Sequence, residues 1–367
     1  MRRIAVAVGA SNIIGLPNRE LAAVIGHLAA DVSSALSNGV EVVLIATGGP
    51  LFGEHVRSSL TVPSSSPVGP VAHSGDRSLS ALGQSEVICA WAAALRGWNV
   101  PCVSISVTHQ DLADHIRFEH LKKVVSDIAS WPGVPMFTEN VVMAAESSLG
   151  DNDQLVCTLA TALQADMLVY LVPDEGLFAA TEGFEKHMVG TVESADDLEA
   201  SVRIVPTQTL LDPSSKLEAA RLVTTFGLEM VVASSLLNGV IGRVIAGDQR
   251  VGTRFLARGA RLRQRKSWLA LASQSRGEIV VSSFLAETLR ARRPASILLI
   301  GIERFAGTFE KNDVVTVRAL DGKTLGRGEV RMSSSELRER ISRRQEGREA
   351  FFGTEVIHCD YFVHAPV

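Results

Sequence analysis

The sequence has few aromatic residues and few cysteines, and it has no long apolar run. Aromatic residues make up 5% of the chain, so the core must consist of Val, Leu, Ile and Ala, which suits buried parallel strands covered by helices. The four cysteines are scattered without a C-x-x-C pair, which excludes a disulfide framework or a zinc site and favours free thiols in a reducing compartment. No apolar run reaches the roughly 18 residues of a membrane helix. We therefore expect a cytoplasmic protein that makes no membrane contact.

Charge is small overall and uneven along the chain. The formal net charge is −4 at pH 7, which argues against a protein whose whole surface binds nucleic acid. The segment 250–266 is nevertheless strongly basic, with Arg250, Arg254, Arg258, Arg261, Arg263, Arg265 and Lys266. Such a segment is typical of an RNA-binding stretch or of a solvated connection between two domains.

The length of 367 residues and a change of pattern near residue 250 predict two domains. Before that point short aliphatic strands alternate with helices, which favours an α/β fold with an open, mostly parallel sheet. Beyond residue 277, short β-rich runs and the turn pair Asp321 and Gly322 predict a small β-barrel. We expect an α/β domain at 1–250, a basic linker at 251–276 and a β-barrel domain at 277–367.

Individual elements of the first domain follow from periodicity and from turn residues. Strands are expected at 4–8, 41–46, 102–107, 167–172 and 230–233, the last of which ends the sheet. Helices are expected at 19–36, 78–96, 111–128, 151–163 and 215–226. The stretch 58–76 is rich in Ser, Pro and Gly without periodicity, which predicts a mobile loop or lid.

The strongest local signal is the polar run G-D-N-D at 150–153, which precedes an apolar helix. One Asp or Asn is enough to cap a helix and to complement its dipole. Three polar residues in a row, Asp151, Asn152 and Asp153, are also typical of groups that hold an amino group of a ligand or position a lysine. This run alone does not distinguish a plain helix start from a binding site.

Two loops of small residues follow the first two predicted strands. The first loop contains Gly9 and Ser11, and the second contains Gly48. Backbone N–H groups in such loops can bind phosphate, and the carboxyl ends of strands are where open α/β sheets bind ligands. A tight turn between strand and helix explains each loop equally well.

Taken in order, these segments resemble the glutamate 5-kinases of the amino acid kinase family, which carry a C-terminal PUA domain. The kinase half is matched by A-L-G-Q at 81–84, G-D-N-D-Q-L at 150–155 and G-T-R-F at 252–255. The PUA half is matched by F-E-K-N-D-V-V at 309–315, S-S-S-E-L at 333–337 and E-V-I-H-C-D at 355–360. The resemblance covers nearly the whole chain and implies an amino-acid-kinase-type sheet followed by a small PUA barrel.

The resemblance also implies an activity, a set of ligands and site residues. The activity is transfer of the ATP γ-phosphate, with Mg²⁺, to the side-chain carboxylate of glutamate, which opens proline biosynthesis. A homo-oligomer (dimer or tetramer), inhibition by proline and an RNA-associated PUA domain are implied as well. Matching positions would make Lys216 and Asp151 catalytic. Substrate would be bound by Gly48, Asn140, Asn152 and Asp153, and nucleotide by Gly9, Ser11, Asp174 and Gly176.

Several positions of the family pattern differ in this chain. Ala7 stands where the V-V-K-x-G-S-S pattern has its lysine, and Gly48 replaces the serine of the T-S-G-A loop. The N-E-N-D loop reads T-E-N-V at 138–141, so that Val141 replaces an aspartate. The L-T-D segment reads L-V-P at 171–173, and the glycine-rich G-T-G-G-M loop is absent.

These differences leave three functions open. The chain is an ATP-dependent carboxylate kinase, or a repurposed enzyme of the same scaffold that acts on a different small carboxylate, or a non-catalytic homologue that binds protein or RNA. A carboxylate is already ionised at pH 7, so the kinase reaction needs positioning and charge neutralisation rather than a general base. We expect Lys216 and the run 151–153 to lie together in a pocket for a small anion.

Overall fold

The computed structural model describes residues 2–9, 18–47, 53, 77–143, 152–180, 186–201, 203–207, 213–258, 264–271, 273–345 and 353–365. The chain divides into two compact units. One is Met1–Asp111 with Arg117–Arg261, and the other is Leu112–Ile116 with Leu262–Val367. Within the described ranges, none of the helices has both the length and the apolar character of a membrane span. The stretch predicted as a lid, 58–76, lies outside these ranges.

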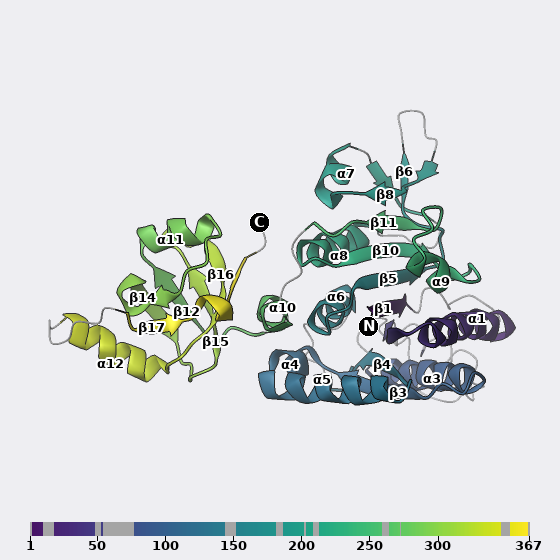
Figure 1. The fold of residues 1–367 in the computed structure, drawn as a ribbon, viewed down its shortest axis with the longest axis horizontal. Helices are drawn as coiled ribbons and strands as arrows, with labels where there is room; N and C mark the ends of the chain where they lie inside the picture. Colours follow the sequence, from purple (N-terminus) through teal and green to yellow (C-terminus); the bar gives the residue numbers. More distant parts are fainter. Residues whose placement is uncertain are drawn as a thin grey trace, which may run out of the picture. The chain divides into compact units, whose positions relative to one another are not determined.

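The first unit is built on an eight-stranded sheet with the order β3-β4-β2-β1-β5-β10-β11-β8 (Figure 1). Its strands are β1 (Arg2–Gly9), β2 (Val40–Thr47), β3 (Cys102–Val107), β4 (Val134–Glu139), β5 (Met167–Val172), β8 (Thr191–Val192), β10 (Glu229–Ser234) and β11 (Thr253–Phe255). All pairings from β3 to β10 are parallel, while β11 runs antiparallel to β10. The predicted α/β class with a mostly parallel sheet is confirmed. The expectation that the strand at 230–233 ends the sheet is wrong, because β11 and β8 extend it.

Helices cover both faces of this sheet (Figure 1). On one face α1 (Asn18–Ser37), α3 (Arg77–Arg96) and α9 (Val240–Ile245) enclose a core that includes Leu28, Trp91 and Val6. On the other face α6 (Asn152–Ala162) and α8 (Ser214–Thr225) pack on β1, β5 and β10. The single helix predicted at 111–128 is interrupted, since α4 (His109–Ala113) ends before α5 (His115–Ser130) begins.

A small antiparallel sheet follows β5 in the first unit. Its strands, in the order β7-β6-β9, are β6 (Phe178–Ala180), β7 (Lys186–Met188) and β9 (Arg203–Val205), and α7 (Ala195–Ser201) precedes β9. Sequence periodicity does not predict these strands, because runs of three residues are too short to show alternation.

The register of the large sheet decides which side chains share a face. Ala7 on β1 is aligned with Ile45 on β2 and with Tyr170 on β5. Side chains of aligned residues in neighbouring strands point to the same side, and the next residue along each strand points to the other. Ala7 and Tyr170 therefore lie on the face covered by α6 and α8, while Val6 and Val169 belong to the core beneath α1 and α3.

The second unit holds two small sheets. The larger, in the order β14-β12-β15-β16-β18, consists of β12 (Gly277–Val281), β14 (Ile302–Gly307), β15 (Val314–Arg318), β16 (Thr324–Glu329) and β18 (Phe362–His364). The smaller pairs β13 (Ile297–Leu298) with β17 (Glu355–Ile357). Helices α10 (Gln264–Leu271), α11 (Ser283–Arg290) and α12 (Ser334–Gln345) and the short η3 (Leu299–Gly301) and η4 (Cys359–Tyr361) complete the unit. Among the described residues, β14 and β18 stand at the two ends of the strand order of the larger sheet.

The structure can be compared with two sequence expectations, a turn at Asp321 and Gly322 and a linker at 251–276. The turn predicted at Asp321 and Gly322 does connect the antiparallel strands β15 and β16, and Gly322 has a φ of +81°, which only glycine adopts readily. The segment 251–276, expected to be a linker, instead supplies β11 to the large sheet of the first unit and α10 to the second unit.

Candidate active site

Three polar side chains meet between the first turns of α6 and α8 and the strand β5. The Nζ atom of Lys216 lies 2.6 Å from Oδ2 of Asp153. The same Nζ atom lies 4.3 Å from the centroid of the Tyr170 ring. The Tyr170 hydroxyl donates a hydrogen bond to Oδ1 of Asp153. Each group thus contacts both of the others, and we call this set the Lys216 cluster.

Lys216 occupies a position that does not favour a cation. It is the third residue of α8, and the first turn of a helix carries partial positive charge. Its backbone N–H is bonded to the Pro213 carbonyl at 3.2 Å, and the residue is 9% exposed. Burial and the helix dipole both disfavour the ammonium, and the Asp153 carboxylate offsets them.

Tyr170 acts as a hydrogen-bond donor in this cluster. Burial raises the pKa of its phenol well above the usual value, and the negative charge of Asp153 raises it further. The phenol therefore stays protonated at neutral pH. The residue is 4% exposed, and its ring packs under the Lys216 ammonium, where a π face is attractive to a cation.

Of the residues predicted for catalysis and substrate binding, the structure brings together Lys216 and Asp153. Asn152 begins α6, but its side chain is not described, and Asp151 and Gly48 lie outside the described residues. Asn140 follows β4, where its Oδ1 accepts the N–H of Met143 at 3.3 Å. The Asn140 oxygen thus stabilises a local turn.

The residues predicted for nucleotide binding have local structural partners where they are described. Gly9 ends β1 beside Thr47, and Ser11 lies outside the described residues. Asp174 accepts a hydrogen bond from the Thr207 hydroxyl at 2.7 Å. Gly176 is buried, and a Cβ there would lie 2.9 Å from the Oγ1 atom of Thr253. Packing on β11 alone therefore explains the glycine at position 176.

Tyr170 is the member of the cluster that sequence reasoning missed. It lies in the run M-L-V-Y-L-V, which predicts nothing more than a buried strand. A signal was present, because the chain has only two tyrosines and a buried phenol needs a hydrogen-bond partner. Its partner could not be identified without the fold, since Asp153 lies 17 residues away along the chain.

Two of the positions at which the chain departs from the family pattern, Ala7 and Val141, are buried. Ala7 is 0% exposed and lies beside Tyr170 in the sheet, and Val141 is 6% exposed just after β4. Gln84 of α3 donates a hydrogen bond to the Glu139 carbonyl and so attaches the end of β4 to α3. The end of β4 therefore keeps a defined position although its aspartate is replaced by valine.

The described arginines of the basic segment 250–266 have carboxylate partners. Its described arginines each pair with a carboxylate: Arg250 with Asp248, Arg254 with Glu229, Arg258 with Asp196 and Arg265 with Glu329. Arg254 is moreover only 6% exposed. These ion pairs stabilise local structure, and RNA binding by the segment 250–266 stays a prediction.

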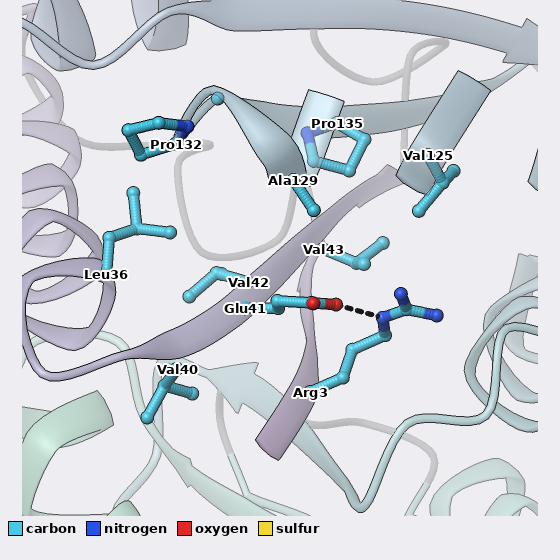
Figure 2. A pocket seen from close by; sticks show the side chains of 11 residues that line it. Arg3, Leu36, Val40, Glu41, Val42, Val43, Val125, Ala129, Pro132 and Pro135 are labelled. Carbon is cyan, nitrogen blue, oxygen red and sulfur yellow. Dashed lines mark hydrogen bonds and ion pairs between the residues drawn. The ribbon is translucent and has the colours of Figure 1, made fainter. Parts of the chain in front are cut away.

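Two other features of the described residues resemble sites. A pocket of about 40 Å³ lies at the amino ends of β1, β2 and β4, away from the Lys216 cluster, and its two charged residues, Arg3 and Glu41, pair with each other at 2.7 Å (Figure 2). In the second unit His358, Cys359 and Asp360 present possible metal ligands within 4.8 Å of one another. However, Nδ1 of His358 accepts the Asp360 N–H at 3.1 Å, which makes it a cap of η4.

Comparisons with known proteins agree with this architecture. The family model described as the amino acid kinase family matches residues 2–205, and that of the PUA domain matches residues 277–346. The chain is 30% identical over 376 residues to glutamate 5-kinase of Bradyrhizobium sp. strain BTAi1, covering 100% of this chain and 96% of that protein. It is 28% identical over 375 residues to glutamate 5-kinase of Syntrophotalea carbinolica, covering 99% of this chain and 97% of that protein.

One solved structure adds a comparison at the level of the fold. Carbamate kinase from Giardia lamblia bound to AMP-PNP superimposes with a TM-score of 0.50 and 14% sequence identity, covering 70% of this chain and 99% of that one. At this identity the likeness concerns the arrangement of strands and helices alone.

Proposed function

Because the chain belongs to the amino acid kinase family, in its glutamate 5-kinase group, and is thus a transferase of the carboxylate kinase type, we propose that it transfers the γ-phosphate of ATP to the side-chain carboxylate of glutamate. The observation that carries this proposal is the Lys216 cluster, which holds a buried ammonium between two helix starts. An ammonium in that position suits a phosphoryl group whose negative charge must be neutralised.

The reaction that we propose assigns no general base to the protein. The side-chain carboxylate of glutamate has a pKa of about 4.3 and is already ionised at neutral pH, so it can attack phosphorus directly. Lys216 would neutralise charge on the transferred phosphoryl group, and Asp153 would hold the lysine in place. In this scheme the protein contributes orientation and electrostatic stabilisation.

ATP and Mg²⁺ enter this proposal as the source of the phosphoryl group and as its counter-ion. Lys216 fits a phosphate because its ammonium is the buried cation of the cluster. Mg²⁺ is usually held by one or two carboxylates together with phosphate oxygens and water. Asp174 is the carboxylate that we propose on the nucleotide side, where it follows β5 beside Thr207. The phosphate-binding roles of Gly9, Ser11 and Gly176 remain proposals.

The proposal is tested by trapping the acyl phosphate. Purified protein would be incubated with MgATP, glutamate and hydroxylamine, and the hydroxamate would be measured, with Lys216→Met as the control variant. We expect hydroxamate that depends on ATP and glutamate and that falls by about 10²- to 10³-fold in the variant, as for loss of one preorganised donor. Absence of hydroxamate from the unmodified protein would contradict the proposal.

A second candidate is phosphorylation of a different small carboxylate. Its support is the apolar character of one departure from the family pattern, Val141, which is nearly inaccessible to solvent. An apolar residue in place of an aspartate weakens the binding of an amino group and would tolerate a substrate without one. The same hydroxamate assay with a panel of acids with and without an α-amino group separates the two candidates by the ratio of their kcat/KM values.

The remaining expectations stay predictions. RNA association of the PUA domain and of the basic segment 250–266 is one of them. Fluorescence anisotropy with RNA at physiological salt measures this, since binding that disappears there is non-specific. A dimer or tetramer, inhibition by proline and a cytoplasmic location are further predictions of the resemblance.

A further inference from the structure

The environment of Tyr170 differs from that of an ordinary core residue. The neighbouring residues of β5 are aliphatic and fully buried, and Tyr170 is the polar member of the strand. Its hydroxyl donates to a carboxylate that already has a cation as partner. A buried tyrosine hydroxyl usually finds a hydrogen-bond partner, and here that partner is a charged side chain.

Ala7 explains how the ring is accommodated. The two residues are aligned across β1 and β5, so the methyl group of Ala7 lies beside the Tyr170 ring on the same face. A longer side chain at position 7 would compete with the ring for that space. The small residue and the large aromatic residue are thus complementary in the sheet under α6 and α8.

We propose that Tyr170 is a positioning residue of this site, which fixes the Asp153 carboxylate through its hydroxyl and the Lys216 ammonium through its ring. The kinetic part of this inference rests on the proposed function, whereas the geometric part does not. When Lys216 turns toward an anionic substrate, Asp153 keeps one donor and is not left without a partner. The ammonium meanwhile stays over the π face of the Tyr170 ring, which carries no negative charge that would compete with the substrate.

Three variants separate the contributions of hydroxyl and ring. Tyr170→Phe removes the hydroxyl and keeps the ring, while Tyr170→Leu removes both. Tyr361→Phe is the matched control, because Tyr361 is the second of the two tyrosines in the chain and belongs to the other unit. Thermal melting of each variant establishes that it is folded. If Tyr170→Leu does not fold, the result for Tyr170→Phe alone decides on the role of Tyr170.

The first readout does not depend on catalysis. An amine-reactive reagent would label the ligand-free protein, and mass spectrometry would quantify Lys216 against Lys122 and Lys323 as internal references. We expect labelling of Lys216 to rise several-fold in Tyr170→Phe and further in Tyr170→Leu, with Tyr361→Phe at the level of the unmodified protein. Equal labelling of Lys216 in folded Tyr170→Phe and in the unmodified protein would overturn the inference.

The second readout is kinetic. With the hydroxamate assay we expect Tyr170→Phe to lower kcat by about tenfold to a hundredfold while the KM for glutamate changes little, because a hydrogen bond to a charged group is lost at a position that does not touch the substrate. In an Asp153→Asn background the same change should have a smaller effect, since the hydroxyl acts through Asp153. Equal effects in both backgrounds would contradict action through Asp153. If the unmodified protein forms no hydroxamate, the proposed function fails and the labelling result still decides on Tyr170.

Discussion

Each face of the large sheet holds a partly buried aspartate near a helix start, and the two aspartates have different partners. On the face of α6 and α8, Asp153 pairs with the ammonium of Lys216 and accepts from Tyr170. On the face of α1 and α9, Asp31 accepts the backbone N–H of Ile241 at 3.0 Å, in the first turn of α9. The first aspartate is matched with a side-chain cation and the second with backbone groups.

The different partners of the two aspartates indicate a structural role for Asp31 and a functional role for Asp153. Burial raises the pKa of Asp31, and hydrogen bonds from the backbone of Ile241 and Gly239 together with nearby His27 counteract only part of that rise. His27 itself contacts the Ser235 carbonyl at 2.8 Å, so α1 holds the segment that follows β10. These contacts all serve local packing. The pairing of Asp153, in contrast, keeps an ammonium at a helix start that would otherwise disfavour it.

Insertion of a second cation beside the Lys216 cluster has the largest expected effect. Ala7→Lys should lower the free energy of unfolding by at least about 3 kcal/mol, because the position is 0% exposed and the Tyr170 ring occupies the adjacent space. Urea denaturation measures this, with Ala7→Met as a control for volume without charge. Tyr170→Leu should recover part of the loss. A stable Ala7→Lys single variant would contradict the complementarity of Ala7 and Tyr170.

Neutralising Asp153 has an intermediate expected effect. Asp153→Asn should lower the free energy of unfolding by about 2 kcal/mol, since Lys216 would lose the charge that compensates it within a nearly buried cluster. Chemical denaturation at pH 7 measures the change. An unaltered unfolding midpoint would mean that solvent compensates Lys216, and the contrast with Asp31 would disappear.

Neutralising Asp31 has the smallest expected effect and the opposite sign. A carboxyl group whose folded pKa is raised contributes stability below its unfolded pKa, and that contribution is lost as the pH rises through the folded pKa. Asp31→Asn should therefore be as stable as the unmodified protein at pH 7, or more stable by less than about 1 kcal/mol. The amide oxygen can still accept from Ile241.

The pH profile sharpens this prediction. As the pH rises from about 4 through the raised folded pKa, the unmodified protein should lose the contribution of Asp31, whereas the Asp31→Asn curve should be flatter over the same interval. Parallel curves for the two proteins would show that Asp31 does not titrate differently in the folded and unfolded states.

Long aliphatic segments of the fold could be predicted from the sequence. The strands at 102–107 and 167–172 begin and end at the expected residues, because each is an apolar or alternating run with clear limits. The short strands β8 and β11 could not be predicted, since their pairing depends on tertiary contacts and not on periodicity. In the second unit, β17 and β18 are separated by η4, where the His358 side chain caps the backbone.

The candidate site was predictable where resemblance supplied matched residues. Lys216 and Asp153 were expected together and form an ion pair, although 63 residues separate them in the chain. Tyr170 was not expected, because its role depends on the parallel register of β1 and β5. A family pattern reports which residues are replaced, and only the fold shows which neighbour occupies the space that the replacement leaves.

The central claim is that the Lys216 ammonium faces the phosphates of a bound nucleotide. Titration calorimetry of Mg·AMP-PNP into the unmodified protein and into Lys216→Met tests it most directly. We predict measurable binding to the former and a dissociation constant at least about tenfold higher for the latter, as for loss of one charge-assisted hydrogen bond. Equal affinity for both proteins, or no binding to either, would contradict the account.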